Sequence, residues 1–174
     1  RLLREAEAHG LTVKYIVNTH SHIDHTMGNR EMVRRTGAKV IIHEADAAGL
    51  QDNPRNILEM FGAEEPPPAD ILVSDGDLIQ IGGVSLKVIH TPGHTPGGMC
   101  LYADGMLFTG DTLFVGSVGR TDFSGGSYAE LERSIRTRLY TLPGDTVVFP
   151  GHNYGITPTS SISHERRNNG VIRG

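Results

Sequence analysis

The sequence predicts a mixed α/β fold in which helices cover β-sheets. Short apolar runs rich in β-branched residues are mixed with segments of helical spacing. Several of these runs are joined by two-residue signals for β-hairpins. Near the C-terminal end, one longer segment carries an apolar residue at every fourth position. Together these patterns favour sheets packed against helices over an all-α or an all-β architecture.

Length and composition describe a globular chain. Its 174 residues suffice for one domain with a substantial core, and we expect a single domain over residues 1–174. Hydrophobic residues make up 37% of the chain and no apolar run approaches the roughly 20 residues that span a bilayer, so no membrane association is expected. The net charge of −4 argues against a nucleic-acid partner. The single cysteine, Cys100, rules out an internal disulfide and favours a cytoplasmic protein.

The N-terminal half predicts alternating helices and strands followed by an irregular stretch. The expected elements are a helix over 1–9, a strand over 13–17, a helix over 29–36 and a strand over 39–42. Gly10 and Gly37 supply the two helix stops. From 44 to 68 the pattern weakens, and the prolines at 66–68 fit neither a helix nor a central strand.

The middle of the chain reads as a set of hairpin-connected strands. The expected strands are 71–73, 78–81, 84–89, 99–103, 106–109 and, later, 146–149. Gly82-Gly83 and Asp104-Gly105 separate neighbouring strands and are typical of two-residue hairpin turns.

The clearest helix is expected over 127–139. Ser127 and Glu130 fit a capping box, and Leu131, Ile135 and Leu139 form one apolar stripe. The last strand is followed by a loop rich in Gly, Ser and Thr and by a short polar tail.

The stretch T-H-S-H-I-D-H at 19–25 places three of the nine histidines and an aspartate within seven residues, directly after a predicted strand. Imidazole and carboxylate groups are common ligands of divalent metals, and such a site needs several donors converging on one point. His20 and His22 are two residues apart and can project to the same side, while Asp24 and His25 continue into the turn. The cluster therefore predicts part of a metal site rather than a solvated polar turn.

Three more ligand-type side chains follow the ends of other predicted strands. His94, Asp111 and His152 each come after a glycine that lets the backbone bend. A lone histidine or aspartate in such a loop is more often a cap or a solvated residue. Three in the same context, together with the first cluster, favour metal binding.

This set of residues resembles the metallo-β-lactamase superfamily, which carries H-x-H-x-D-H followed by His, Asp and His in this order. The resemblance spans residues 11 to 152 and implies an αββα sandwich with a metal pair at one edge of its two sheets. It implies that His20, His22 and His94 hold one ion, that Asp24, His25 and His152 hold the other, and that Asp111 bridges them. The family begins with a strand pair before the first helix. Residues 1–10 start after that point, so we expect an N-terminally incomplete domain with an exposed sheet edge.

The remaining histidines and the cysteine are expected to be structural. His9, His43, His90 and His164 lie outside the motif, and Cys100 is expected to face the core from a strand. In the β-lactamase branch proper a cysteine ligand stands where this chain has Asp111, which argues against that branch.

A metal pair of this kind implies hydrolysis by a metal-bridging hydroxide, because two cations lower the pKa of a shared water to about 7. Asp24 would orient this nucleophile or take its proton. The motifs at 108–114 and 119–123 are similar to the glyoxalase II branch, in particular its short single-domain bacterial members. This similarity implies a glutathione-linked thioester substrate such as S-D-lactoylglutathione, with Arg120 and Tyr154 as candidate substrate contacts. Arg120 and Asp122 also have a plainer interpretation as a pair that locks their loop.

Other activities remain open at this point. The same motifs are similar to persulfide dioxygenases, which bind a single iron through two histidines and a carboxylate. A lactone or phosphoester hydrolase of the same superfamily is a third candidate. We expect two divalent ions, zinc first, with iron or manganese as alternatives.

Overall fold

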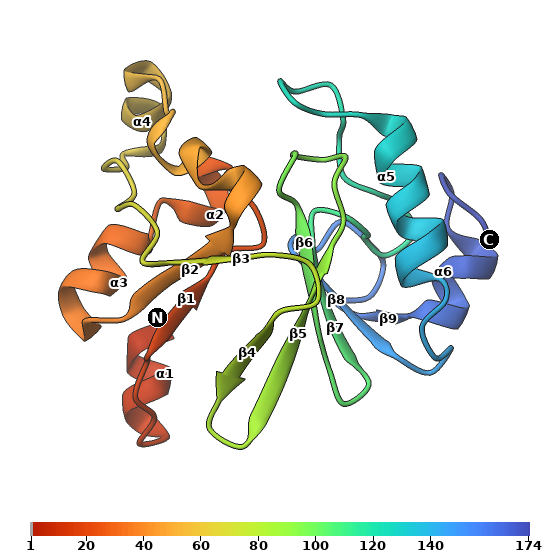
Figure 1. The fold of residues 1–174 in the computed structure, drawn as a ribbon, viewed down its shortest axis with the longest axis horizontal. Helices are drawn as coiled ribbons and strands as arrows, with labels where there is room; N and C mark the ends of the chain where they lie inside the picture. Colours follow the sequence, from red (N-terminus) through yellow and green to blue (C-terminus); the bar gives the residue numbers. More distant parts are fainter. Residues whose placement is uncertain (1) are drawn as a thin grey trace.

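The computed structural model describes residues 2–174 and consists of two β-sheets between two sets of helices (Figure 1). The first sheet has the parallel order β1-β2-β3, formed by Tyr15–Val17, Lys39–His43 and Ile71–Val73. The second sheet has the order β4 to β9, and its neighbours are antiparallel except for the parallel pair β7 and β8. Its strands are Leu78–Ile81, Val84–His90, Met99–Ala103, Met106–Gly110, Val147–Pro150 and Ser160–Ser161.

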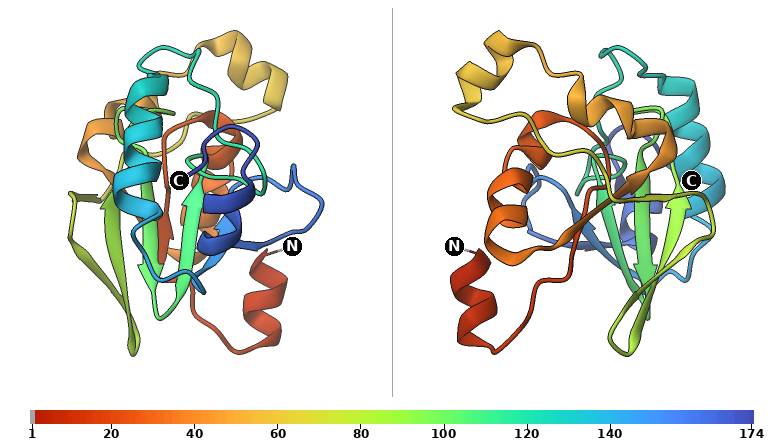
Figure 2. Two further views of the ribbon diagram at one scale, coloured as in Figure 1. Left: turned by 90° about the vertical axis from the view of Figure 1, so that its right-hand side faces the viewer. Right: turned by 60° about the vertical axis from the view of Figure 1, so that its left-hand side comes forward.

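The helices lie on the two sides of the pair of sheets (Figures 1 and 2). On the side of the first sheet are α1, α2, α3, the short 3₁₀ helices η1 and η2, and α4. Their bounds are Leu2–Ala8, Ile23–Thr26, Asn29–Thr36, Glu44–Asp46, Ala48–Gln51 and Arg55–Phe61. On the side of the second sheet, α5 spans Tyr128–Ser134, continues as the π-helical turn η3 at Ile135–Leu139, and is followed by α6 at Ile162–Asn168. Arg1, part of the first expected helix, lies outside the described residues.

Three apolar layers hold these elements together. Ile41 and Val73 of the first sheet pack with Val88 and Leu101 of the second, which makes the layer between the sheets. A second layer joins the other face of the second sheet to α5, η3 and α6, and a third joins the first sheet to α3 and η2. Four layers of secondary structure around three apolar layers give the predicted αββα sandwich, and the predicted fold class is confirmed.

The best predicted elements are those with strong local signals. Leu131, Ile135 and Leu139 are all fully buried, as the apolar stripe requires. The capping box is only half formed, because Ser127 accepts a hydrogen bond from the Glu130 amide while the Glu130 carboxylate faces Arg133. At the hairpin between β6 and β7, Asp104 and Gly105 both have positive φ, the geometry of a type I′ turn.

The sequence-based prediction was wrong for two segments. The stretch 44–68 contains η1, η2 and α4. It escaped prediction because α4 buries no residue completely and so lacks an apolar stripe. The tail contains β9 and α6, and its Ile162 and Ile172 are fully buried. Ser161 caps the start of α6, because its hydroxyl accepts a hydrogen bond from the His164 amide.

None of the helices within residues 2–174 has both the length and the apolar character needed to cross a bilayer. The first sheet ends at β1, which pairs with β2 on one side only among the described strands.

Cys100 is expected to be chemically inert in the folded protein. Its side chain is fully buried in the layer beneath α5, as predicted, and burial raises the pKa of the thiol to about 11. Because the thiolate is the reactive species, Ellman's reagent at pH 8 should react at least ~100-fold more slowly with folded than with guanidinium-unfolded protein. Rapid release of one equivalent of chromophore from the folded chain would contradict this.

Candidate metal centre

The structure brings all seven side chains of the sequence motif together at one edge of the sandwich. Three groups of ligand-type side chains each have donor atoms within 4.8 Å of one another. These groups are His20, His22 and His94; His20, His25 and Asp111; and Asp24, His25 and His152. The first and the third coincide with the two ligand sets that the resemblance implies, and the second joins them.

Strand ends place these side chains. His20 and His22 follow β1, and Asp24 and His25 lie on α2, which replaces the turn expected there. His94 follows β5, Asp111 follows β7 and His152 follows β8. Because these strands end at the same edge, residues up to 128 positions apart along the chain, such as Asp24 and His152, meet in one ligand group.

The glycines before the three distant ligands do different things. Gly93 and Gly110 have φ values of +136° and +48°, so they bend the backbone as expected. Gly151 has no positive φ; a side chain there would instead lie within 2.5 Å of the Asp111 carboxylate. At Gly151 the site therefore needs space rather than an unusual backbone conformation.

The first ligand set is divided between two loops. His22 Nδ1 and His94 Nε2 face each other at 2.9 Å, and the His20 ring lies 4.9 Å from His22 and 4.8 Å from His94. The other nitrogen of His94, Nδ1, donates a hydrogen bond of 2.6 Å to the Arg120 carbonyl. A metal-binding histidine is usually fixed in this way, with one nitrogen bonded to a carbonyl and the other directed to the ion.

The second ligand set is more open to solvent. His25 Nε2 lies 3.0 Å from His152 Nε2, and an Asp24 carboxylate oxygen lies 3.3 Å from His152 Nε2. The Asp24 side chain is 40% exposed, against 16% for His25. Asp24 is therefore the group of this set that solvent or a substrate reaches most easily.

Asp111 lies between the two sets. Its carboxylate is 3.7 Å from His94 Nε2 on one side, and 3.3 Å from His25 and 3.4 Å from His152 on the other. Only 10% of its side chain is exposed. A single carboxylate in contact with both sets is the arrangement that a bridging ligand requires.

The polar atoms of the cluster are suited to binding metal ions. Among the described residues, four buried side-chain atoms have no hydrogen-bond partner, and His20 Nε2 and Asp111 Oδ1 are two of them. Buried polar atoms rarely stay unpartnered, and both of these belong to the cluster. Burial lowers the pKa of His20 and of His22, and the neighbouring histidines lower both further. Neutral imidazole is the form that binds metal, so these shifts suit a cation site.

His25 differs from its neighbours. Burial lowers the pKa of its imidazole, but the Asp111 carboxylate 3.3 Å away, together with Asp24, outweighs burial and raises it. The two carboxylates therefore supply the negative potential of the site at the second ligand set.

A cleft of about 820 Å³ opens over the ligands. Arg120 and Tyr154, the candidate substrate contacts, both line it, together with Ile57 and Phe61 of α4. The Arg120 guanidinium forms the expected pair with Asp122 at 2.7 Å and lies 4.4 Å from the centre of the Phe123 ring. Tyr154 stacks on the His152 ring at 4.9 Å, and Phe114 meets the edge of that pair.

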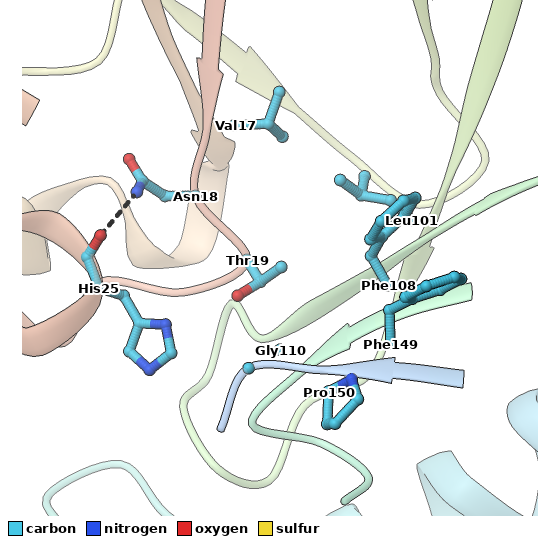
Figure 3. Close-up of a pocket in the computed structure, with 10 residues that line it drawn as sticks. Val17, Asn18, Thr19, His25, Leu101, Phe108, Gly110, Phe149 and Pro150 are labelled. Carbon is cyan, nitrogen blue, oxygen red and sulfur yellow. Dashed lines mark hydrogen bonds between the residues drawn. The ribbon is translucent and has the colours of Figure 1, made fainter. Parts of the chain in front are cut away.

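Behind the ligands, a second cavity of about 290 Å³ lies between the sheets (Figure 3). Leu101, Phe108 and Phe149 form its apolar wall, and the His25 ring stands at its end. The side-chain Nδ2 of Asn18 donates a hydrogen bond to the His25 carbonyl at 3.5 Å, which ties the end of β1 to α2. This contact holds the second ligand set against the first sheet.

The four other histidines lie outside the three ligand groups, as predicted. His43 and His90 stack on each other with ring centres 4.0 Å apart, whereas His9 and His164 are exposed. Sequence reasoning missed Asp46, Phe114, Phe123 and the cleft residues of α4. Phe114 and Phe123 end the two motifs at 108–114 and 119–123, which could have pointed to them. Asp46 and α4 lie in a stretch without a metal motif, so only their positions in space connect them with the site.

Comparison with known proteins assigns a family to this arrangement. A sequence model of the metallo-beta-lactamase superfamily matches residues 1–152. Hydroxyacylglutathione hydrolase GloC of Haemophilus influenzae is 33% identical over 97% of this chain and 80% of its own length. Mitochondrial persulfide dioxygenase ETHE1 of Homo sapiens is 35% identical over 90% of this chain and 56% of its own.

Two solved structures have the same fold over almost the whole chain. BLEG-1 B3 metallo-beta-lactamase superposes with a TM-score of 0.88 at 31% identity, covering 99% of this chain and 83% of its own. TTHA1623, solved in a di-iron-bound form, superposes with a TM-score of 0.85 at 31% identity, covering 98% and 83%. The relatives thus include hydrolases and an oxygenase.

Proposed function

Because this chain belongs to the metallo-beta-lactamase superfamily, we propose that it is a metal-dependent hydrolase that cleaves a thioester such as S-D-lactoylglutathione. The observation that carries the proposal is the position of Asp111 between two complete ligand sets. His20, His22 and His94 would hold one ion, Asp24, His25 and His152 the other, and Asp111 both. Similarity to a hydroxyacylglutathione hydrolase supports the thioester.

When bound, two divalent cations supply a water of lowered pKa and a positive charge that polarises the carbonyl oxygen of the substrate. The protein contributes the rest. Asp24, exposed on the cleft, accepts the proton of the attacking water or orients it. A thioester suits the site because its thiolate leaves without needing strong protonation by an acid.

The cleft supplies substrate contacts. The Arg120 guanidinium, the proposed partner of a substrate carboxylate, is held over Phe123 by its pair with Asp122. Tyr154 presents its ring beside His152, where it contacts the acyl or thiol part of the substrate. Zinc is the ion we propose first, with iron or manganese as alternatives; the di-iron form of one structural relative supports iron. The lone buried Cys100 is consistent with a cytoplasmic protein.

A second candidate function is persulfide dioxygenation. The similarity to ETHE1 supports it, and a single iron would need only two histidines and a carboxylate, such as His20 or His22 with His94 and Asp111. The assembled second set of Asp24, His25 and His152 favours the two-ion hydrolase. A lactone or phosphoester hydrolase would use the same two-ion site.

One assay panel on metal-quantified protein separates these activities. We expect hydrolysis of S-D-lactoylglutathione by protein that holds two ions per chain, loss of this activity on chelation, and recovery when metal is restored. A lactone, a phosphodiester, and glutathione persulfide with O₂ complete the panel. Protein with one iron per chain that consumes O₂ with the persulfide and leaves the thioester intact would overturn the proposal.

A further inference from the structure

A buried carboxylate outside the ligand sets joins the two loops that carry the first set. Asp46 ends η1, immediately beyond β2, and its residue is only 2% exposed. One of its oxygens accepts a hydrogen bond of 2.9 Å from the Ser21 amide, and the other accepts one of 2.6 Å from the Gly97 amide. Both oxygens of Asp46 are therefore committed to backbone amides.

The two amides lie in segments that follow strands of different sheets. Ser21 lies between His20 and His22 in the segment that leaves β1 of the first sheet. Gly97 lies three residues after His94 in the loop that leaves β5 of the second sheet. Asp46 thus spans the junction across which His22 Nδ1 and His94 Nε2 face each other at 2.9 Å.

The junction is tightly packed around Asp46. A side chain at Gly97 would lie 2.5 Å from the Asp46 amide nitrogen and 2.7 Å from its carboxylate.

A second contact connects β2 with the loop after β5, because His43, at the end of β2, stacks on His90. His90 Nε2 donates a 2.9 Å hydrogen bond to the Pro96 carbonyl, in the same loop as Gly97.

We propose that Asp46 is a positioning residue that fixes His20 and His22 opposite His94 and thereby sets the affinity of the first metal site. The second set lies on α2 and after β8, and Asp46 makes no hydrogen bond to either of those segments within residues 2–174. The effect of Asp46 is therefore selective for one of the two ions. This inference rests on the two ligand sets of the proposed function.

The test is Asp46→Asn, which keeps the shape of the side chain. An amide has one acceptor oxygen and an NH₂ group, so it leaves the Ser21 or the Gly97 amide facing a donor. Stepwise Zn²⁺ dissociation constants, measured against a chromophoric chelator, should show the first site weakened by roughly 10- to 100-fold, the usual effect of losing an outer-shell partner. The second site should change by less than about threefold.

Two ligand variants assign the steps. His22→Ala should remove the binding step of the first site, and His152→Ala should remove the binding step of the second site. If neither removes a distinct step, the ligand sets of the proposed function are wrong, whatever Asp46→Asn does. The affinity readout is thus separate from catalysis.

Glu165→Gln is the matched control. Glu165 is also a fully buried carboxylate that accepts backbone and side-chain hydrogen bonds, from Gly116 at 2.9 Å and Asn169 at 2.8 Å. None of its partners lies within three residues of a ligand. This variant should lower the thermal midpoint of the apo-protein and leave both dissociation constants unchanged.

Gly97→Ala is a second probe. It keeps Asp46 as an aspartate, but the added methyl group collides with Asp46 and pushes the same two loops apart. It too should weaken the first site selectively. The proposal is overturned if Asp46→Asn or Gly97→Ala binds both ions as tightly as the wild type. It is equally overturned if the two affinities fall by the same factor in Asp46→Asn.

Discussion

Asp111→Asn is expected to lower kcat/KM for the thioester by on the order of 10³-fold or more and to leave fewer than two ions per chain. The carboxylate is in contact with both ligand sets, at 3.7 Å from His94 and 3.3 Å from His25, and is 10% exposed. An asparagine has the same shape but no negative charge to share between two cations. A loss of about 4 kcal/mol of transition-state stabilisation corresponds to this factor.

The control for Asp111→Asn lies at the other end of the same strand. Asp104→Asn makes the same change of charge in the hairpin before β7, where the positive φ of +45° is one that asparagine adopts readily. This variant should keep its rate within about twofold and hold both ions, because surface changes of this kind cost little. Steady-state rates and atomic emission on the same samples measure both quantities. If both variants retained activity and both ions, Asp111 would not be a ligand.

Gly93→Ala is expected to lower the free energy of unfolding by about 3 kcal/mol or more and to weaken the first metal site. Gly93 has a φ of +136°, which side-chain-bearing residues rarely adopt, and a Cβ there would collide with the backbone of Leu131 in α5. Strain and overpacking each cost roughly 1–3 kcal/mol. The adjacent His94 moves with this turn, because the Gly93 carbonyl is held by the Ser127 amide at 2.8 Å.

Urea unfolding of the apo-protein and zinc titration measure the two consequences of Gly93→Ala. Gly83→Ala is the control, since Gly83 has no positive φ and open space around its Cβ position. It should change the unfolding free energy by no more than about 0.5 kcal/mol, as exposed substitutions usually do. Equal stability losses in the two variants would show that the contact between the turn and α5 has no special importance.

Local sequence signals predicted most of the secondary structure. The spacing of Leu131, Ile135 and Leu139 was sufficient because a helix repeats its face every 3.6 residues, and all three are fully buried. Asp104-Gly105 was sufficient because few other pairs adopt positive φ at both turn positions. The segment with α4 and the helix α6 escaped because their stability comes from contacts with distant parts of the chain.

The metal-ligand motif was also legible in the sequence. His20, His22, Asp24 and His25 stand within six positions, so their density alone indicated metal chemistry. His94, Asp111 and His152 could be recognised by their place after strand ends. Their ligand roles remain predictions that the metal titrations above will test.

The sequence by itself determined the residue types, their order and the strand ends after which they stand, because these are properties of neighbouring positions. Only the tertiary structure decided which nitrogen of His22 faces His94, that Asp111 lies between the two sets, and that Asp46 bridges the two loops that carry the first set. The contacts within the site join residues from 17 positions apart, as for His94 and Asp111, to 127 apart, as for His25 and His152. Packing of the two sheets against each other brings together residues that are far apart in the sequence, and no local pattern of residues encodes such contacts.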